Sequence, residues 1–129
     1  MAERRAHFER KFRNVWSTGP TGASFVQLTV EDPVKAEDLI SHLFHHTLVA
    51  DVEHYKQKTY RSYVADGHEQ IYGDVTRIVM ITSDDRVAEL IEEVAAKNPN
   101  SRPHPAFDLV VTPLATGSKE YLEWVKLQT

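Results

Sequence analysis

Residues 25–46, FVQLTVEDPVKAEDLISHLFHH, carry the pattern that decides the fold. The first six residues are apolar and β-branched enough for a buried strand, and Asp32 followed by Pro33 is a typical helix start. Beyond Pro33, apolar side chains recur at helical spacing and define one face of a helix. They are Ala36, Leu39, Ile40, Leu43 and Phe44. The stretch predicts a strand that leads directly into an amphipathic helix.

A long hairpin is predicted next. Residues 48–65 are rich in Val, Tyr and Thr, and Asp66-Gly67 favours a tight turn into a strand over about residues 68–82. A first strand of about 16 residues reaches roughly 50 Å, more than the width of a domain this small. The hairpin should therefore project and pair with a neighbouring subunit. We expect a homo-oligomer whose contacts include Tyr60, Tyr63 and Trp124.

A second strand and helix unit follows the hairpin. Ser83 and the next two aspartates start an amphipathic helix, residues 99–105 hold three prolines, and residues 107–112 form a strand before a last helix capped at Ser118. The order β-α-β-β-α-β plus a helix predicts an α+β fold, the ferredoxin-like sandwich with two helices on one face of an antiparallel sheet. The predicted core includes Phe25, Leu28, Ile40, Leu43, Val79, Ile81, Leu90, Ile91, Val94, Leu109 and Val111.

Composition excludes several classes of function. The 129 residues fit one domain, and the absence of cysteine excludes disulfides, thiol catalysis and thiolate metal ligands. A formal net charge of −4 argues against nucleic-acid binding, and no apolar run is long enough to cross a membrane. The chain has no P-loop, GxSxG or HExxH motif. We therefore expect a protein of the cytoplasm that is not an enzyme.

The N-terminal segment differs in charge from the rest. Residues 1–16 hold five basic and two acidic side chains and are +3, whereas the remaining 113 residues are −7. An aromatic stripe of Phe8, Phe12 and Trp16 accompanies the basic residues. Three interpretations stay open, namely a helix docked on the domain, a flexible tail, and a targeting or membrane-surface segment. Residues 17–24 have the composition of a linker, so we divide the chain into an extension and linker, 1–23, and a domain, 24–129.

A histidine pair on the first helix is a candidate metal site. His42 and His46 are four residues apart, as are Asp38 and His42, so all three can lie along one exposed ridge. Two imidazoles at this spacing can chelate Cu²⁺, Zn²⁺ or Ni²⁺, with Cu²⁺ favoured by the general affinity order. The alternative is a solvated polar helix face, because the sequence indicates no third ligand.

Several segments together resemble the divalent-cation-tolerance (CutA) family, whose members are small trimeric ferredoxin-like proteins. These segments are QLTVEDPVKAEDL, LVADV at 48–52, VMIT at 79–82, RPHPAFDLVVTPL at 102–114 and SKEYLEWV at 118–125. The last is the most specific, since members commonly close with a helix of the type xxEYLxWI. The resemblance implies a homotrimer with a role in divalent metal tolerance or homeostasis.

The family's proposed metal ligands map onto residues of different chemistry. The cysteine of the first strand corresponds to Leu28, the second cysteine to Asp51 and the histidine to Arg102. The alternative is a harder site built from His104, Asp108 and Asp51. The metal candidates are therefore His42, His46, His104 and Asp108. The resemblance also leaves a second class open, a sensor similar to the PII signalling proteins, which bind small molecules between subunits. Its candidate anion-binding residues are Lys56, Lys58, Arg61, Arg77 and Arg102.

Overall fold

The computed structural model describes residues 20–61, 71–97, 99–100 and 108–129. They form one antiparallel sheet with the strand order β2-β3-β1-β4, and three helices. The elements in chain order are β1 (Ala23–Val30), α2 (Pro33–His45), β2 (Asp51–Arg61), β3 (Ile71–Ser83), a 3₁₀ turn (Asp84–Arg86), α3 (Val87–Lys97), β4 (Val110–Pro113) and α4 (Lys119–Gln128). The predicted ferredoxin-like order with an additional C-terminal helix is confirmed.

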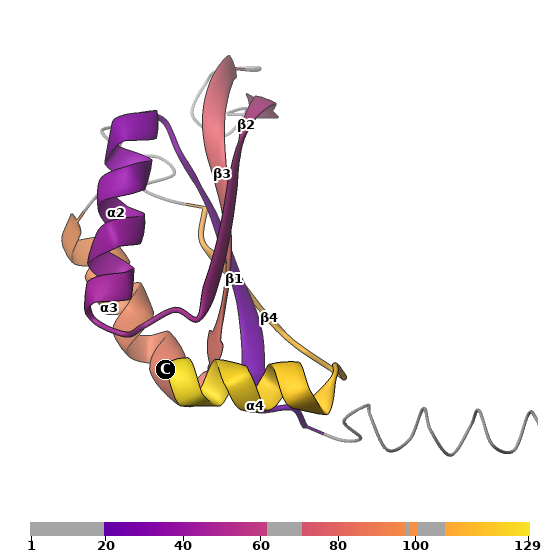
Figure 1. Cartoon of the computed structure of the whole chain (residues 1–129). Coiled ribbons are helices and arrows are strands. Elements are labelled where there is room, and N and C mark those ends of the chain that lie inside the picture. Colours follow the sequence, from indigo (N-terminus) through magenta and orange to yellow (C-terminus); the bar gives the residue numbers. More distant parts are fainter. Residues whose placement is uncertain (1–19, 62–70, 98, 101–107) are drawn as a thin grey trace, which may run out of the picture.

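The sheet has one covered face and one open face. Helices α2 and α3 pack together over the covered face, whereas α4 crosses the end of the sheet (Figure 1). Side chains alternate along β1, so that Val26, Leu28 and Val30 point toward the helices and are fully buried. Their partners in this core include Ile78 and Met80 of β3. A smaller cluster under α4 contains Ala23, Ala50, Ile81, Leu122 and Val125.

Helix α2 begins and ends as its sequence indicates. The Asp32 side chain accepts a hydrogen bond from the Val34 amide at 2.8 Å, and Pro33 is the first helical residue. At the other end Thr47 adopts a positive φ of 53°, and the Leu48 amide donates to the Leu43 carbonyl at 3.0 Å. The connection occupies residues 46–50, and the next strand starts at Asp51 rather than at Leu48 as predicted.

Two other boundaries differ from the sequence-based expectation. Strand β1 starts at Ala23, inside the expected linker, because Thr21 and Ala23 are buried and the Thr21 hydroxyl donates to the Leu114 carbonyl at 2.7 Å. Ser83 precedes the 3₁₀ turn without a capping hydrogen bond, because its hydroxyl instead bonds that of Thr129. The predicted turn at 66–67 and most of the predicted connector lie outside the described residues.

The core prediction was wrong for Phe25. Its side chain is 37% exposed because it lies on the open face, opposite its buried neighbours Ser24 and Val26. Leu28, Leu43, Ile81, Leu90 and Val94 are buried as predicted, whereas Ile40, Val79, Ile91, Leu109 and Val111 are half-buried.

Candidate functional site

Two helices bring three metal-ligating side chains together. His42 lies on the last turn of α2, His46 is the C-cap residue that follows this helix, and Glu93 lies on α3. The potential ligand atoms of the three residues all lie within 4.8 Å of one another. The His42 Nε2 atom is 2.6 Å from the Glu93 Oε2 atom, and the His42 and His46 ring centroids are 4.4 Å apart. We call these three residues the histidine–glutamate site.

The end of α2 is tied to the start of α3 next to this site. The Arg86 guanidinium donates to the His46 carbonyl and to the Thr47 hydroxyl, each at 3.3 Å, and also pairs with Glu89 at 2.9 Å. The left-handed turn at Thr47 places the His46 carbonyl within reach of Arg86. The backbone that carries His46 is therefore fixed with respect to the helix that carries Glu93.

The charges at the site favour an ionised carboxylate. The hydrogen bond from His42 lowers the pKa of Glu93 below its ordinary value of 4.5, and the positive charges of His42, His46 and Lys97 act in the same direction. Partial burial opposes them and raises the pKa, but it does not outweigh the hydrogen bond. Glu93 is thus available as an anionic oxygen ligand at neutral pH.

The sequence indicated two of these three residues and misplaced one of them. His42 was expected on an exposed ridge with Asp38, but its side chain is only 22% exposed because it turns toward α3. Glu93 was missed, since it lies 51 positions from His42 along the chain. The sequence offered one signal for Glu93. It predicted that the two helices pack side by side on one face of the sheet, so that polar residues of one helix can lie next to those of the other.

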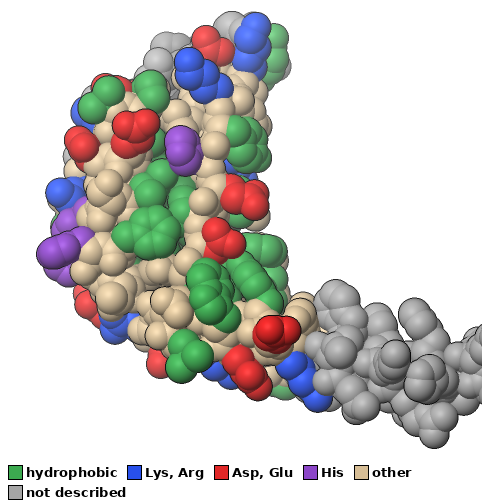
Figure 2. Space-filling view, viewed as in Figure 1, with side chains coloured by type: hydrophobic (Ala, Val, Ile, Leu, Met, Phe, Trp, Pro, Cys, Tyr) green, Lys and Arg blue, Asp and Glu red, His purple; other side chains and the backbone are tan. Residues whose placement is uncertain are grey.

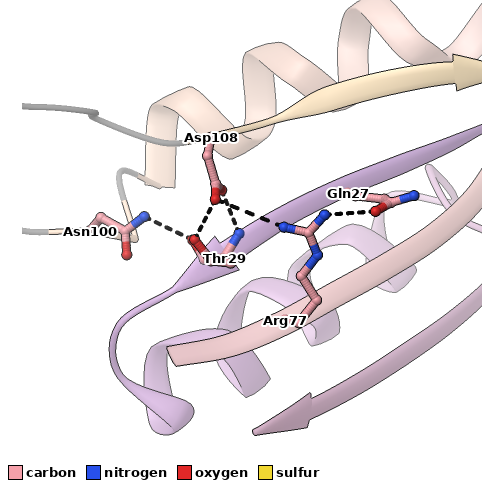
Figure 3. A network of polar contacts seen from close by, with 5 residues as sticks. All are labelled: Gln27, Thr29, Arg77, Asn100 and Asp108. Carbon is pink, nitrogen blue, oxygen red and sulfur yellow. Dashed lines mark hydrogen bonds and ion pairs between the residues drawn. The ribbon is translucent and has the colours of Figure 1, made fainter. Parts of the chain in front are cut away.

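Asp108 belongs to a different set of contacts, at the end of β1 on the sheet (Figure 3). Its carboxylate accepts hydrogen bonds from the Thr29 amide at 2.6 Å and from the Thr29 hydroxyl at 2.7 Å, and it lies 3.9 Å from Arg77. Arg77 also donates to Gln27 at 2.7 Å, while Asn100 donates to the Thr29 carbonyl at 3.0 Å. The carboxylate of Asp108 thus joins the connector before β4 to β1, and His104 lies outside the described residues.

The positions inherited from the resemblance have no soft ligand. Leu28 is fully buried in the core, and Asp51 accepts a hydrogen bond from the Tyr121 hydroxyl at 2.9 Å. Arg102 lies outside the described residues. Among the described residues, the histidine–glutamate site is therefore the only group of three or more His, Asp or Glu side chains whose potential metal-ligand atoms lie within 4.8 Å of one another.

The residues predicted at subunit contacts are exposed where they are described. Tyr60, on the long hairpin, is 71% exposed, and Trp124 on α4 is 41% exposed. Tyr63 lies outside the described residues. These exposures leave both aromatic side chains available to a partner.

A groove next to the hairpin contains two of the lysines considered for anion binding. Its volume is about 440 Å³, and Lys56, Lys58, Glu31 and Asp74 supply its charged side chains. Two acidic groups balance the two basic ones, so the charges do not favour an anion. Arg77 is engaged with Gln27 and Asp108 and does not line this groove.

Comparison with known proteins gives a consistent result. The family model described as CutA1 divalent ion tolerance protein matches residues 24–128. Comparison with curated protein sequences finds no significant match. Among solved structures, the chain is similar to the periplasmic divalent cation tolerance protein CutA from Archaeoglobus fulgidus, with 21% identity, a TM-score of 0.72, and coverage of 82% of this chain and 97% of that one.

Two further structures support the same fold. The divalent cation tolerance protein from Thermus thermophilus has 22% identity and a TM-score of 0.72, with coverage of 83% of this chain and 98% of that chain. CutA from Synechococcus elongatus has 13% identity and a TM-score of 0.76, with coverage of 88% and 94%. None of the helices in the described part of the chain has the length and apolar character that crossing a membrane requires.

Proposed function

The chain belongs to the CutA1 divalent ion tolerance protein family, and on that basis we propose that it is a non-enzymatic homotrimer that binds a divalent transition-metal ion. The observation that carries the proposal is the histidine–glutamate site, where His42, His46 and Glu93 converge. Imidazole and carboxylate are suitable ligands for Cu²⁺ and Zn²⁺ in a chain that has no thiolate to offer. We further propose that the protein acts in the cytoplasm.

The geometry of the site fits such an ion after a small adjustment. Ligand atoms about 2.0 to 2.1 Å from a tetrahedral ion lie about 3.3 Å from one another. The His42 and Glu93 atoms, now 2.6 Å apart, must separate slightly, while His46 must move closer. His46 is exposed and Glu93 half-buried, so both side chains can move without disturbing the core.

Calorimetry with Cu²⁺ and Zn²⁺ tests the metal site. We expect one ion per chain, with Cu²⁺ bound more tightly than Zn²⁺, and with weaker binding at acid pH because a protonated imidazole cannot coordinate. Glu93→Gln should weaken binding at least about tenfold, and the double variant His42→Ala, His46→Ala should abolish it. His54→Ala, which removes an exposed histidine on β2, is the matched control and should bind as the wild type does.

Tight binding that survives the double histidine change contradicts this assignment. The remaining candidates are then His104 and Asp108. Mapping the bound copper by its paramagnetic effect on nearby nuclei would distinguish the two positions.

The trimer proposal rests on the difference between the two edge strands of the sheet. Strand β2 has 11 residues and β4 has four, and each is an edge of the sheet in the described chain. Pairing of one edge with the other in a neighbouring copy is a heterologous contact, which closes into a ring when the rotation permits. The length of the β2–β3 hairpin, paired from Asp51 to Arg61, provides the surface that such a ring needs.

Sedimentation of the full chain at micromolar concentration tests the oligomer, with a single species of three chains as the expected result. Tyr60→Asp places a charge on the exposed hairpin and should shift the distribution toward monomer. Val34→Asp is the control, because Val34 is 64% exposed and lies on helix α2 rather than on an edge strand. A clean monomer in the wild type would contradict the trimer.

The second candidate is a PII-like sensor, whose lysines Lys56 and Lys58 line a groove that Glu31 and Asp74 leave without a net positive charge. Thermal-shift measurements with nucleotides and with divalent metals separate the two functions. We expect metals, and not nucleotides, to raise the melting temperature.

A further inference from the structure

The histidine–glutamate site supplies three ligands rather than four. Its members are His42, His46 and Glu93, and no fourth His, Asp or Glu of the described residues joins the group. Closed structural zinc sites take all four ligands from the protein, whereas a site with three protein ligands keeps one position for water or another exogenous ligand. An ion held here would therefore keep one coordination position that the described part of the chain does not fill.

Two neighbouring side chains are the natural candidates for a fourth ligand, and neither is in place. His45 lies against His46 in an edge-on contact, with ring centroids 5.4 Å apart, but it does not belong to the group of ligand atoms. Successive residues of a helix are about 100° apart, so His45 and His46 flank His42 on its two sides. Glu89, one turn before Glu93 on α3, is paired with an arginine at 2.9 Å.

The site is accessible from solvent. His46 is exposed, and the side chains of His42 and Glu93 are 22% and 31% exposed. Figure 2 shows histidine side chains at the surface of the helix layer, over α2 at the left of the view. Helices α2 and α3 form the layer that covers one face of the sheet, so an assembly that forms through the strands leaves this position open.

The chemistry of the site favours a neutral nitrogen donor in the open position. Imidazole suits Cu²⁺ and Zn²⁺, whereas carboxylate and water suit harder ions. Glu93 already supplies one carboxylate, and residues 17–129 together are −7, which disfavours the approach of an anion. The basic group next to His46, Arg86, is paired with Glu89 and does not offset this effect.

We propose that the metal-loaded histidine–glutamate site takes an imidazole group from outside the chain as its fourth ligand, an inference that rests on the metal binding proposed above. The imidazole nitrogen donates its lone pair to the ion and displaces a water molecule, with no change of oxidation state. The donor is a free imidazole compound or a histidine side chain of another protein. A site of this kind serves the transfer of a metal ion between molecules rather than its storage.

Electron paramagnetic resonance of the full chain with one equivalent of Cu²⁺ tests the open position. Before any addition, the hyperfine couplings should show two protein nitrogens, from His42 and His46. Isotopically labelled imidazole should add a third nitrogen with the coupling of the label, in a complex that keeps its copper through gel filtration. A spectrum that imidazole leaves unchanged, or copper that elutes with imidazole and without protein, would overturn the proposal.

The variant His45→Ala separates an exogenous ligand from an internal one. We expect it to bind copper and then imidazole as the wild type does. The matched control is His54→Ala, which removes an exposed histidine of β2 and should behave in the same way. Three protein nitrogens in the wild type without imidazole, together with uptake of imidazole by His45→Ala alone, would show that His45 completes the site and would refute an open position.

Two further additions identify the class and the source of the ligand. Imidazole should bind to the copper-loaded protein at least about tenfold more tightly than acetate, and equal affinities would contradict the preference for nitrogen. An unstructured peptide with one internal histidine is compared with its alanine counterpart. Uptake of the histidine peptide as well as imidazole supports transfer between proteins, whereas uptake of imidazole alone supports a small-molecule donor.

The same spectra distinguish failure of this inference from failure of the proposed function. Copper that shows no coupling to protein nitrogens contradicts metal binding at His42 and His46, and with it the open position. Copper bound by both histidines that does not take up imidazole contradicts only the open position.

Discussion

The two faces of the sheet are stabilised in different ways, although the same strands provide both. On the covered face, Leu28 and Val26 are fully buried under the chain's own helices. On the open face, Phe25 is 37% exposed and Gln27 is half-buried beside Arg77. Burial of apolar area under two helices therefore stabilises the covered face, whereas the open face combines polar contacts with a smaller apolar cluster under α4.

This difference suggests that the covered face of the sheet serves folding, whereas the open face serves contacts with other segments or copies. The helix layer completes the core within one chain. Removal of the apolar side chains of this core from water provides most of the stabilisation of the fold. The open face is completed by α4 at one end only, and it keeps aromatic and charged groups accessible. We expect mutations on the covered face to unfold the protein, and mutations on the open face to change its contacts with other segments or copies.

The sharpest test of this comparison uses two residues of β1. Leu28→Ala should lower the free energy of unfolding by about 2 to 5 kcal/mol, because it leaves a cavity in a core that cannot fully collapse. Phe25→Ala on the other face should cost clearly less, since its side chain is partly exposed already. Urea unfolding of both variants measures the difference, and equal losses would contradict the distinction between the faces.

A second test concerns the polar contacts of the open face. Asp108→Ala removes the acceptor of the Thr29 amide and hydroxyl, and should lower the free energy of unfolding by about 1 to 3 kcal/mol. Glu92→Ala on the exposed surface of α3 is the control, with an expected change within about 0.5 kcal/mol. A loss for Asp108→Ala no larger than that of the control would show that the network contributes nothing to stability.

A third test follows the ionisation of Tyr121. Its pKa is raised to about 12 by burial first and by Asp51 second. Asp51→Asn should therefore lower this pKa toward, but not to, the ordinary value of 10. Because the folded value is the higher one, the contribution of neutral Tyr121 to stability is complete below pH 10 and is lost as the pH rises through about 12.

Ultraviolet titration measures this change. The tyrosinate signal of Tyr121 is isolated as the difference between each protein and its Tyr121→Phe counterpart. A pKa that Asp51→Asn leaves unchanged would show that burial alone is responsible.

The smallest expected effect is at the outer surface of the helix layer. The pKa of Glu93 is lowered by His42, so their contact stabilises the fold above pH 4.5 and is lost as the pH falls through the lower folded value. The melting temperature of Glu93→Gln should be below that of the wild type at neutral pH, and the two should converge in acid. Measurements with a metal chelator present keep this effect separate from metal binding, and Glu92→Gln should show no such convergence.

The sequence predicted the order of elements well, because hydrophobic periodicity is a local property. Asp32 with Pro33, and Ser118, marked two helix starts that the structure confirms. Burial of Phe25 was predicted wrongly, because the sequence of a short apolar strand does not show whether one or both faces of the sheet are covered. Which face receives the helices depends on the handedness and packing of the whole chain.

The candidate metal site shows the same limit. The spacing of His42 and His46 is visible within one helix, and it identified a pair of possible ligands. Glu93 joins them through the packing of α2 on α3, which no spacing within one segment can show. The role of Asp108 is also non-local, because it depends on how the connector returns to the end of β1.

The central position of β1 has a consequence for the rate of folding. Strand β1 is made first along the chain, but it lies between β3 and β4, and Thr29 contacts Asp108 across 79 positions. Among the described strands, only β2 and β3 are both consecutive in sequence and paired. Closing long loops costs entropy before the contacts compensate for it, so proteins with many distant contacts fold slowly. We therefore expect the hairpin to form early, and the insertion of β1 beside it to limit the rate of folding.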